Sequence, residues 1–403
     1  MTKNNNLIKY MTVLFALSVG VYRLSRAVSG IMQAIATMIG LYLLFKNRSK
    51  LRIKPLLYNY YKVYGFFILG LVPSLFVSTN FNESIRFFIE YPVYQFMMFV
   101  FITMFETDLT RLRFAMAVPL ISGMLDAITM IYQSQVLGHY RPGGIAANPL
   151  HSASIIFIML IVSIAVSIDS KSFGKRLNCL ARVCLLPYIG AYVLGHHRSL
   201  WICTPIPALA SMGRFLFTSK KVLITVVCCA LLAGGYITTH QDYMKRIQSI
   251  TQVENYSTKV RINIWNSAYN MYKDYPVAGV GLEQFQVYYV DYGYWGKREK
   301  EENRTYSHAH NSFMATAAEA GTCGLVGFIV FCMGFTIVPL RAWFKTKSTF
   351  DALLFAISFG FLILLGMFDP TFYEHKAAVR YFWLVLSVVL CMKQIYEHQE
   401  VGL

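Results

Sequence analysis

Residues 151–168 read HSASIIFIMLIVSIAVSI and carry no Asp, Glu, Lys or Arg. A helix needs about 20 mainly apolar residues to cross the roughly 30 Å hydrocarbon core of a bilayer, so this stretch predicts a membrane-spanning helix. Apolar runs without a charged residue recur along the chain, at 11–21, 27–45, 64–77, 222–237, 325–340 and 381–392. This pattern is typical of a membrane protein and not of several soluble domains.

The composition supports the same conclusion. Hydrophobic residues make up 56% of the 403 residues and charged residues only 14%, whereas soluble domains carry about 25% charged residues. We predict an all-α polytopic membrane protein with about 12 transmembrane helices. The predicted spans are 7–22, 27–45, 58–77, 87–105, 114–136, 151–168, 178–194, 199–217, 222–238, 311–340, 350–368 and 379–395.

The positive charges favour one orientation in the membrane. Together with the adjoining ends of the predicted spans, the N-terminus, the C-terminus and the loops on the same side hold 19 Lys and Arg, against seven on the opposite side outside the large loop. The richer side is cytoplasmic by the positive-inside rule, which places both termini in the cytoplasm. The net charge of +17 does not indicate nucleic-acid binding, because the basic residues form no single continuous face.

The chain divides into three parts on this topology. Residues 1–238 form transmembrane helices 1–9, residues 239–310 form a large periplasmic loop, and residues 311–403 form helices 10–12 with a cytoplasmic tail. The loop has nine basic and eight acidic residues, and long loops translocate largely regardless of charge. No small-x-small cleavage site follows the first apolar run, so we expect an uncleaved first helix.

Part of the large loop is predicted to be helical. Arg261, Trp265, Ala268 and Tyr272 recur at the spacing of one helix face. Residues 273–281 (KDYPVAGVG) then end this helix with a proline and glycines, and a second short helix is expected near 282–289. The glycines do not form a nucleotide-binding loop, because no third glycine or strand accompanies them.

Three arginines are notable on the predicted outward side: Arg141 in GHYRPGGIAANP, Arg198 in GHHRSLW and Arg261 in the loop helix. One interpretation is that each extends its guanidinium to lipid headgroups. The other is an anion site, since guanidinium groups stay charged and bind phosphate through paired hydrogen bonds. Three arginines in loops otherwise poor in basic residues favour the anion site, and a diphosphate would suit them.

His310 in SHAHNSF is the candidate for acid–base chemistry. We expect it beside the start of the tenth span, where the helix dipole favours the neutral imidazole that can accept a proton. His308, two residues earlier, is a competing candidate. An ordinary interfacial histidine is the alternative interpretation of His310.

Other polar residues allow two interpretations or carry no site. Glu319 and Asp126, inside predicted spans, are either proton relays or structural partners for arginines and backbone groups. His196 and His197 have no carboxylate clustered with them in the sequence, so we predict no metal site and no cofactor. All eight cysteines lie in or beside predicted spans, so we expect no disulfide framework in the large loop.

Two stretches resemble motifs of the O-antigen ligase and O-antigen polymerase superfamily of bacterial envelope glycosyltransferases. His310 and Asn311, nine residues and then GTCG at 321–324 are similar to the ligases' His-Asn, nine variable residues and G-x-x-G. The run 261–281 is similar to the family's Arg, Trp, Pro and Gly-x-Gly run. His197 and Arg198 resemble a junction between two middle spans where the family usually has Ser or Thr before the arginine.

The resemblance implies an O-antigen ligase of the bacterial inner membrane, a multi-pass glycosyltransferase surrounded by membrane lipids with its site facing the periplasm. It implies an inverting, metal-independent transfer of a glycan from undecaprenyl diphosphate to a hydroxyl of lipid A–core, with no cofactor. The site residues would be His310 as the catalytic base, Arg141, Arg198 and Arg261 on the diphosphate, and Asn311, His197, Trp265 and Glu319 in support.

Two alternatives remain open at this point. An O-antigen polymerase would use the same donor with a second lipid-linked glycan as acceptor. A transporter or flippase of lipid-linked anions would be expected to have paired charges at mid-membrane and often two similar halves. The notable charges of this chain cluster at one side instead, and no internal repeat is evident.

Overall fold

The computed structural model describes residues 2–48, 55–241, 243–245, 248, 256–293 and 306–400. Every regular element within these ranges is a helix, so the all-α prediction is confirmed. Nine of the helices in these ranges are long and apolar enough to cross a membrane, as expected for a polytopic membrane protein. The count of twelve spans and the three-part division of the chain remain predictions.

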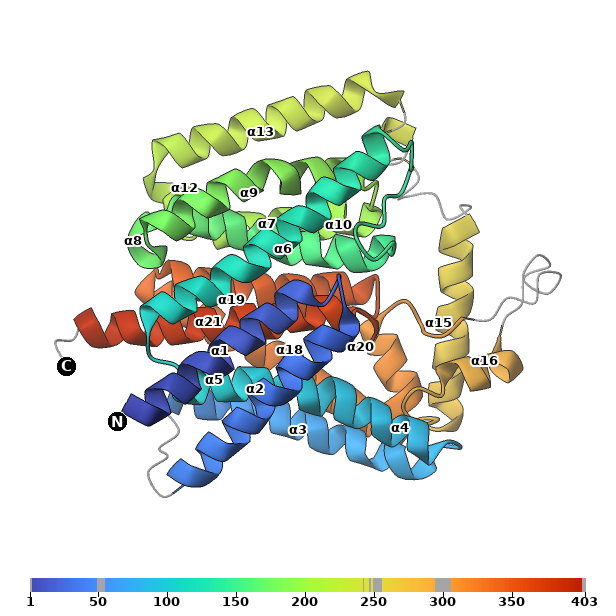
Figure 1. Cartoon of the computed structure of the whole chain (residues 1–403). Helices are drawn as coiled ribbons and strands as arrows, with labels where there is room; N and C mark the ends of the chain where they lie inside the picture. Colours follow the sequence, from blue (N-terminus) through green and yellow to red (C-terminus); the bar gives the residue numbers. More distant parts are fainter. Residues whose placement is uncertain are drawn as a thin grey trace.

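Most of the long helices lie side by side in one bundle (Figure 1). Two π-helices, η1 and η2, and one 3-10 helix, η3, interrupt the α-helices. In chain order the elements are α1 (Thr2–Val21), α2 (Arg26–Asn47), α3 (Pro55–Val77), α4 (Phe81–Phe88), η1 (Ile89–Val93), α5 (Tyr94–Phe105), α6 (Leu109–Gln135), α7 (Pro149–Ile168), α8 (Ser170–Phe173), α9 (Lys175–Leu194), α10 (Arg198–Cys203), α11 (Pro205–Ser211), α12 (Phe215–Thr218), α13 (Lys220–Thr239), α15 (Tyr256–Asp274), α16 (Phe285–Tyr292), α18 (Ser312–Thr346), α19 (Thr349–Ser358), η2 (Phe359–Leu364), η3 (Leu365–Met367), α20 (Thr371–Glu374) and α21 (Lys376–Glu400).

The bundle has two distinct ends. Both termini lie at one end together with α8 and α12, and we call this the terminal end (Figure 1). At the opposite end, the loop end, α4 and α10 lie near α15 and α16, which stand outside the bundle (Figure 1). The loops predicted to share a side of the membrane therefore share an end of the bundle. Which end faces the periplasm remains a prediction.

The centre of the bundle explains the uniformly apolar stretch at 151–168. α7 and α21 are the most enclosed spanning candidates, with 83% and 94% of their apolar windows buried inside the protein. α7 packs against α6, α9, α11, α19 and α21. A helix that is hydrophobic on all sides is expected where protein surrounds it, and α7 has that position.

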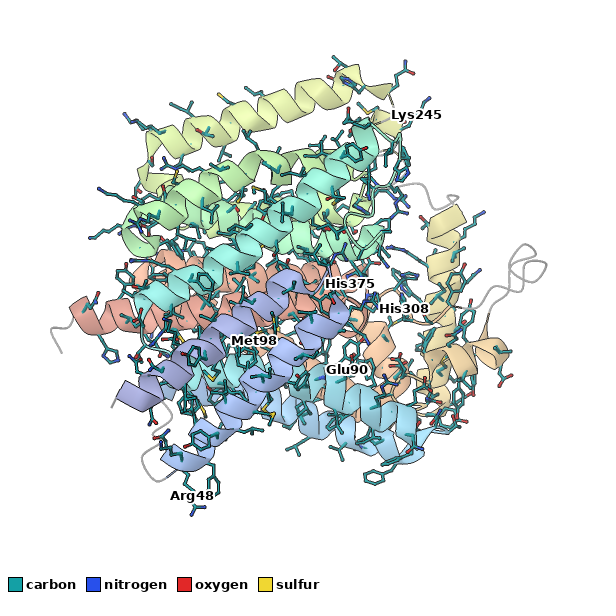
Figure 2. All side chains as sticks on the ribbon, viewed as in Figure 1. Arg48, Glu90, Met98, Lys245, His308 and His375 are labelled. Atoms are coloured by element: carbon teal, nitrogen blue, oxygen red, sulfur yellow. The ribbon has the colours of Figure 1, made fainter. Side chains whose placement is uncertain are left out.

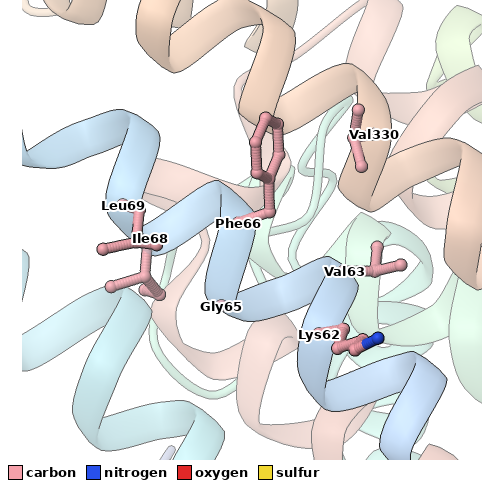
Figure 3. Close-up of a pocket in the computed structure, with 7 residues that line it drawn as sticks. All are labelled: Lys62, Val63, Gly65, Phe66, Ile68, Leu69 and Val330. Atoms are coloured by element: carbon pink, nitrogen blue, oxygen red, sulfur yellow. The ribbon is translucent and has the colours of Figure 1, made fainter.

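Small residues let α3 and α18 approach closely. A Cβ on Gly70 would lie 2.5 Å from the carbonyl oxygen of Cys323, and one on Gly327 would lie 3.0 Å from Cα of Phe67. Close backbone approach at glycine is a common means of helix packing in membranes. The outer side of this contact is an open, largely apolar groove (Figure 3), lined by Lys62, Val63, Gly65, Phe66, Ile68, Leu69 and Val330.

The predicted continuous helix at 199–217 is wrong. The segment forms three short helices, α10, α11 and α12. Proline lacks the N–H that continues a helix, and Pro205 and Pro207 open α11. Gly213 then adopts a left-handed φ of 58° before α12, a conformation that glycine adopts readily. The break leaves α10 as a separate short helix at the loop end.

Candidate active site

Asp369 lies at the centre of a cluster at the loop end. Nη2 of Arg261 is 3.6 Å from Oδ1 of Asp369, and Nδ1 of His310 is 3.5 Å from the same oxygen. The side chains of Arg261 and His310 are 30% and 22% exposed, whereas that of Asp369 is 4% exposed. The structure thus brings together two residues singled out by the sequence and adds a carboxylate that sequence reasoning missed.

His310 directly precedes the N-cap of α18, as predicted. The Asn311 side chain caps the helix, since its Oδ1 accepts hydrogen bonds from the N–H groups of Phe313 (2.9 Å) and Met314 (3.1 Å). The Asn311 amide also donates to the carbonyl of Met367 at 2.9 Å. These bonds tie the segment that carries His310 to the segment that carries Asp369.

Two further features constrain this junction. The hydroxyl of Ser312 donates to the backbone carbonyl of Asp369 at 3.3 Å. His310 itself has a left-handed φ of 49°, which is disfavoured for a residue with a side chain and persists only where the surroundings impose it. The position of the imidazole is therefore set by the fold.

Arg261 is positioned by the helix predicted for the loop. α15 packs against α18, and its buried apolar residues are Ile264, Ala268 and Met271. Ala268 belongs to the predicted helix face, and Arg261 and Trp265 of that face flank the buried stripe. The indole N–H of Trp265 is buried and has no hydrogen-bond partner among the described residues.

A kink in α18 holds the loop in place. Gly321 has φ 59° and ψ −158°, which breaks the helical backbone. The freed carbonyls of Ala318 and Glu319 accept from the N–H groups of Val280 (2.9 Å) and Gly281 (3.0 Å), and the N–H of Thr322 donates to the carbonyl of Pro276 at 2.7 Å. The KDYPVAGVG segment therefore replaces the helical hydrogen bonds that α18 loses at the kink.

Glycine is required on both sides of this contact. A Cβ on Gly279 would collide with the backbone of Glu319, and a Cβ on Gly321 would collide with the backbone of Val277. Both glycines also have positive φ, which residues with a Cβ rarely adopt. Gly321, the first glycine of G-x-x-G, thus allows the kink in α18 and its contact with the loop segment, and it is not a packing contact between transmembrane helices.

The environment of Asp369 keeps its carboxylate charged. Burial alone would raise the pKa of Asp369, but contact with His310 and the charges of Arg261 and His375 together hold it below the usual range. The distance to His310 and its alignment fall short of a hydrogen bond, so Nδ1 of His310 and Oδ1 of Asp369 are buried without one among the described residues. Such contacts in catalytic sites commonly shorten when substrate binds.

The sequence of this region matches a known family. A model described as O-antigen ligase matches residues 183–329, from α9 into α18. The match covers 147 of the 403 residues and supports membership of the O-antigen ligase and polymerase superfamily. No curated protein matches the chain significantly.

The ligase-family match includes Arg198, Arg261 and His310 but neither Arg141 nor Asp369. Members of this superfamily are glycosyltransferase-like enzymes of O-antigen processing. Asp369 lies outside the matched segment, in the turn after η3. The fold brings it next to the matched residues Arg261 and His310.

Arg141 and Arg198 form a second group at the loop end. Nη2 of Arg141 lies 3.5 Å from Nδ1 of His197, and His197 is the N-cap of α10, which begins at Arg198. α10 packs against η3, which ends two residues before Asp369. The structure therefore places Arg198 on a helix that contacts the segment leading to Asp369.

Glu319 and Asp126, the carboxylates singled out inside predicted spans, have structural contacts. Oε1 of Glu319 accepts from the backbone N–H of Phe285 at 3.2 Å, at the start of α16. Oδ1 of Asp126 pairs with Arg23 at 3.3 Å and accepts from the N–H of Ile145 at 2.8 Å. Asp126 thereby anchors the α6–α7 loop that carries Arg141, which favours the structural interpretation of both carboxylates.

Proposed function

We propose that this protein is an O-antigen ligase that transfers a glycan from undecaprenyl diphosphate to a hydroxyl of lipid A–core at the periplasmic face of the inner membrane. The observation that carries the proposal is the meeting of His310 and Arg261 at the buried carboxylate of Asp369. This arrangement provides a base and an anion-binding group at one place, as a glycosyl transfer from a diphosphate requires.

Asp369 sets the role of each imidazole nitrogen. Because the carboxylate lies beside Nδ1 of His310, it favours the tautomer with a proton on Nδ1 and leaves the lone pair on Nε2. Nε2 then accepts the proton of the acceptor hydroxyl. The hydroxyl oxygen bonds to the anomeric carbon of the donor sugar as the bond from that carbon to the phosphate oxygen breaks, with inversion of configuration.

The arginines stabilise the leaving group. Undecaprenyl diphosphate departs with the bonding electron pair, so negative charge grows on its bridging oxygen. Fixed positive charge for the diphosphate comes from Arg261, Arg198 and Arg141. Such preorganised charges account for a large part of the rate enhancement in many enzymes. The unpartnered indole N–H of Trp265 is a further donor on the helix that carries Arg261. In this account the arginines provide the charge that a divalent metal would otherwise provide.

The polymerase alternative differs in the acceptor alone. The family match does not distinguish the two activities, and both would use the same donor. The His-Asn and G-x-x-G spacing favours the ligase. A transporter is less well supported, because Arg261, His310 and Asp369 converge at the loop end and not at mid-membrane.

Reconstitution distinguishes the two enzymes. Purified protein receives a lipid-linked glycan donor and lipid A–core, in excess EDTA, and the products are separated by size. We expect glycan-capped lipid A–core to form without a second protein. Lengthened lipid-linked chains with unchanged lipid A–core would establish the polymerase instead, and dependence on added divalent metal would contradict the arginine account.

Topology can be measured separately. In a variant that lacks the native cysteines, Val290→Cys places a thiol on α16, where Val290 is 53% exposed. We expect a membrane-impermeant thiol reagent to label it from the periplasmic side of intact cells. Labelling from the cytoplasmic side alone would reverse the topology and exclude a periplasmic site.

A further inference from the structure

A polar cavity lies at the loop end, apart from the contact between Arg261, His310 and Asp369. Its volume is about 230 Å³, and it is lined by Tyr22, Arg23, Arg26, Tyr91, Ala146, His151, Glu283 and Lys376. Ligand pockets commonly measure roughly 300–1,000 Å³. The cavity is therefore suited to one sugar or one phosphate group and not to a longer glycan.

The described lining of this cavity has three basic side chains, Arg23, Arg26 and Lys376, and one acidic side chain, Glu283, so basic groups are in excess. Arg23 pairs with Asp126 and Lys376 pairs with Glu90, both at 3.3 Å. Arg26 is exposed, and no carboxylate of the described chain lies within ion-pair distance of it. A guanidinium outside any ion pair at the wall of a cavity can bind an oxyanion.

A buried cation behind the wall adds to this charge. The guanidinium of Arg380 lies over the ring of Tyr22, 4.3 Å from its centroid, and Arg380 is 7% exposed. It donates to the hydroxyl of Ser29 at 2.5 Å and pairs with no carboxylate among the described residues. Nε of Arg380 and Nε of Arg23 are both buried without a hydrogen-bond partner in the described part of the chain. Buried charge of this kind is costly when it is not compensated, and a bound anion would compensate it.

Two steps connect the cavity to the candidate active site. The ring of His151, in the cavity wall, lies 4.8 Å from the ring of His375. The backbone N–H of His375 donates to the carbonyl of Thr371 at 3.2 Å, and the N–H of Thr371 donates to the carbonyl of Asp369 at 2.8 Å. Oδ1 of Asp369 in turn contacts His310. Figure 2 shows His375, His308 and Glu90 towards the same end of the bundle. A group in the cavity is thus close enough to belong to a substrate that reacts at His310.

We propose that this cavity binds an anionic sugar of the acceptor glycan, one that carries a phosphate or a carboxylate. The inference rests on the proposed transferase function and names the chemistry by which the acceptor is selected. Arg26 supplies the unpaired positive charge, and Arg23 and Lys376 supply further donors. The acceptor is the better occupant than the donor, because the donor's diphosphate already has Arg261, Arg198 and Arg141.

The test compares Arg26→Ala with Arg86→Ala. Arg86 is an exposed arginine in α4 at the same end of the bundle and lies outside the cavity lining. Initial rates are measured in phosphatidylcholine nanodiscs with native acceptor and with acceptor whose phosphates and carboxylates have been removed. We expect Arg26→Ala to raise KM for the anionic acceptor about tenfold, the effect of losing one charge-assisted hydrogen bond, with little change in kcat. The preference for the anionic over the neutral acceptor should fall by the same factor, and Arg86→Ala should preserve it.

Other outcomes would overturn the inference. An equal rise in KM for both acceptors, or no rise for either, would show that Arg26 does not distinguish anionic from neutral acceptors. A rise in KM for the donor alone would assign the cavity to the donor. A loss that appears only when phosphatidylglycerol is added to the nanodiscs would assign it to a lipid headgroup.

Direct binding separates this inference from the transferase proposal. Purified protein is titrated with glucose 1-phosphate, glucuronate and glucose, and binding is followed by calorimetry. We expect wild type and Arg86→Ala to bind at least one of the two acidic sugars more tightly than glucose, and Arg26→Ala to lose that difference. Glycan transfer without this selectivity would leave the function intact and overturn the cavity assignment. Selectivity without transfer would support the cavity and overturn the function.

Discussion

Buried carboxylates at the two ends of the bundle differ in how completely they are paired. At the terminal end, Asp351 pairs with Lys393 at 2.6 Å and accepts from the hydroxyl of Thr346 at 2.8 Å. At the loop end, Asp369 meets Arg261 and His310 at 3.6 and 3.5 Å, and its Oδ1 has no hydrogen bond among the described residues.

Glu106 repeats the pattern of the terminal end. It pairs with Arg111 at 2.9 Å, accepts from the hydroxyl of Thr12 at 2.6 Å and accepts from the backbone N–H groups of Thr107 and Asp108 at 2.9 Å each. Buried polar groups in stable folds normally have their partners. The difference indicates that Asp351 and Glu106 hold helices together at the terminal end, whereas Asp369 at the loop end keeps bonding capacity for a reaction.

Loss of the base should have the largest effect on activity. We expect His310→Ala to reduce transfer by about 10²–10⁴-fold, the usual contribution of general acid–base catalysis, while the protein inserts normally. His308→Ala is the matched control and should retain most of the activity, because Asp369 contacts His310 and not His308. Transfer assays on purified variants measure both. An essential His308 with a dispensable His310 would move the reactive centre away from Asp369.

Loss of the guanidinium geometry should have the second-largest effect on transfer. Arg261→Lys and Arg198→Lys keep the charge but lose the planar pair of donors. A hydrogen bond to a charged group contributes about 1.5–3 kcal/mol, so we expect transfer to fall about 10- to 100-fold. Arg86→Lys is the control on the same end of the bundle. Near-normal rates in both test variants would mean that these arginines contact lipid headgroups and not substrate.

The carboxylate of Asp369 should have a smaller effect with a distinctive signature. Asp369→Asn keeps the shape but removes the charge beside Nδ1 of His310, and we expect transfer to fall about tenfold, equivalent to about 1.4 kcal/mol. Because the change keeps the size and polarity of the side chain, the loss should appear in kcat, with little change in KM for the donor or in the unfolding temperature. A loss of rate that is explained by a smaller folded fraction would show that Asp369 has a purely structural role.

The sequence predicted His310 and Arg261 because each carries a local signal. His310 lies where a span begins, and Arg261 belongs to a set of residues at helical spacing in the large loop. Asp369 has no such signal, since it lies in the turn between two late spans, and a lone Asp before Pro370 is typical of any turn. Its contact with His310 arises from the bonds that Asn311 and Ser312 make to Met367 and Asp369.

The kink in α18 was beyond sequence reasoning for a related reason. Glycines in a transmembrane helix commonly let helices approach, and Gly327, three residues after G-x-x-G, does so against Phe67. Gly321 instead adopts a left-handed φ and exchanges hydrogen bonds with the loop segment 276–281. Spacing alone cannot separate these uses of glycine, because the partner of each glycine is distant in the sequence.

The smallest effect on catalysis is expected at the terminal end, where the comparison can be tested most directly. Asp351→Asn leaves Lys393 buried, with Glu397 one turn away at 3.5 Å as its remaining partner. Removing one member of a buried pair commonly costs about 3–5 kcal/mol, so the unfolding temperature of the purified protein should fall clearly. The folded fraction should retain the wild-type kcat and the wild-type pH–rate profile, because Asp351 holds α19 to α21 and contacts no residue of the candidate site. Asp369→Asn, measured in parallel, should show the opposite pattern of a reduced rate with a smaller change in unfolding temperature. If Asp351→Asn instead lowered kcat as much as Asp369→Asn at an unchanged unfolding temperature, then complete pairing would not mark a structural carboxylate in this protein, and the distinction between the two ends would fail.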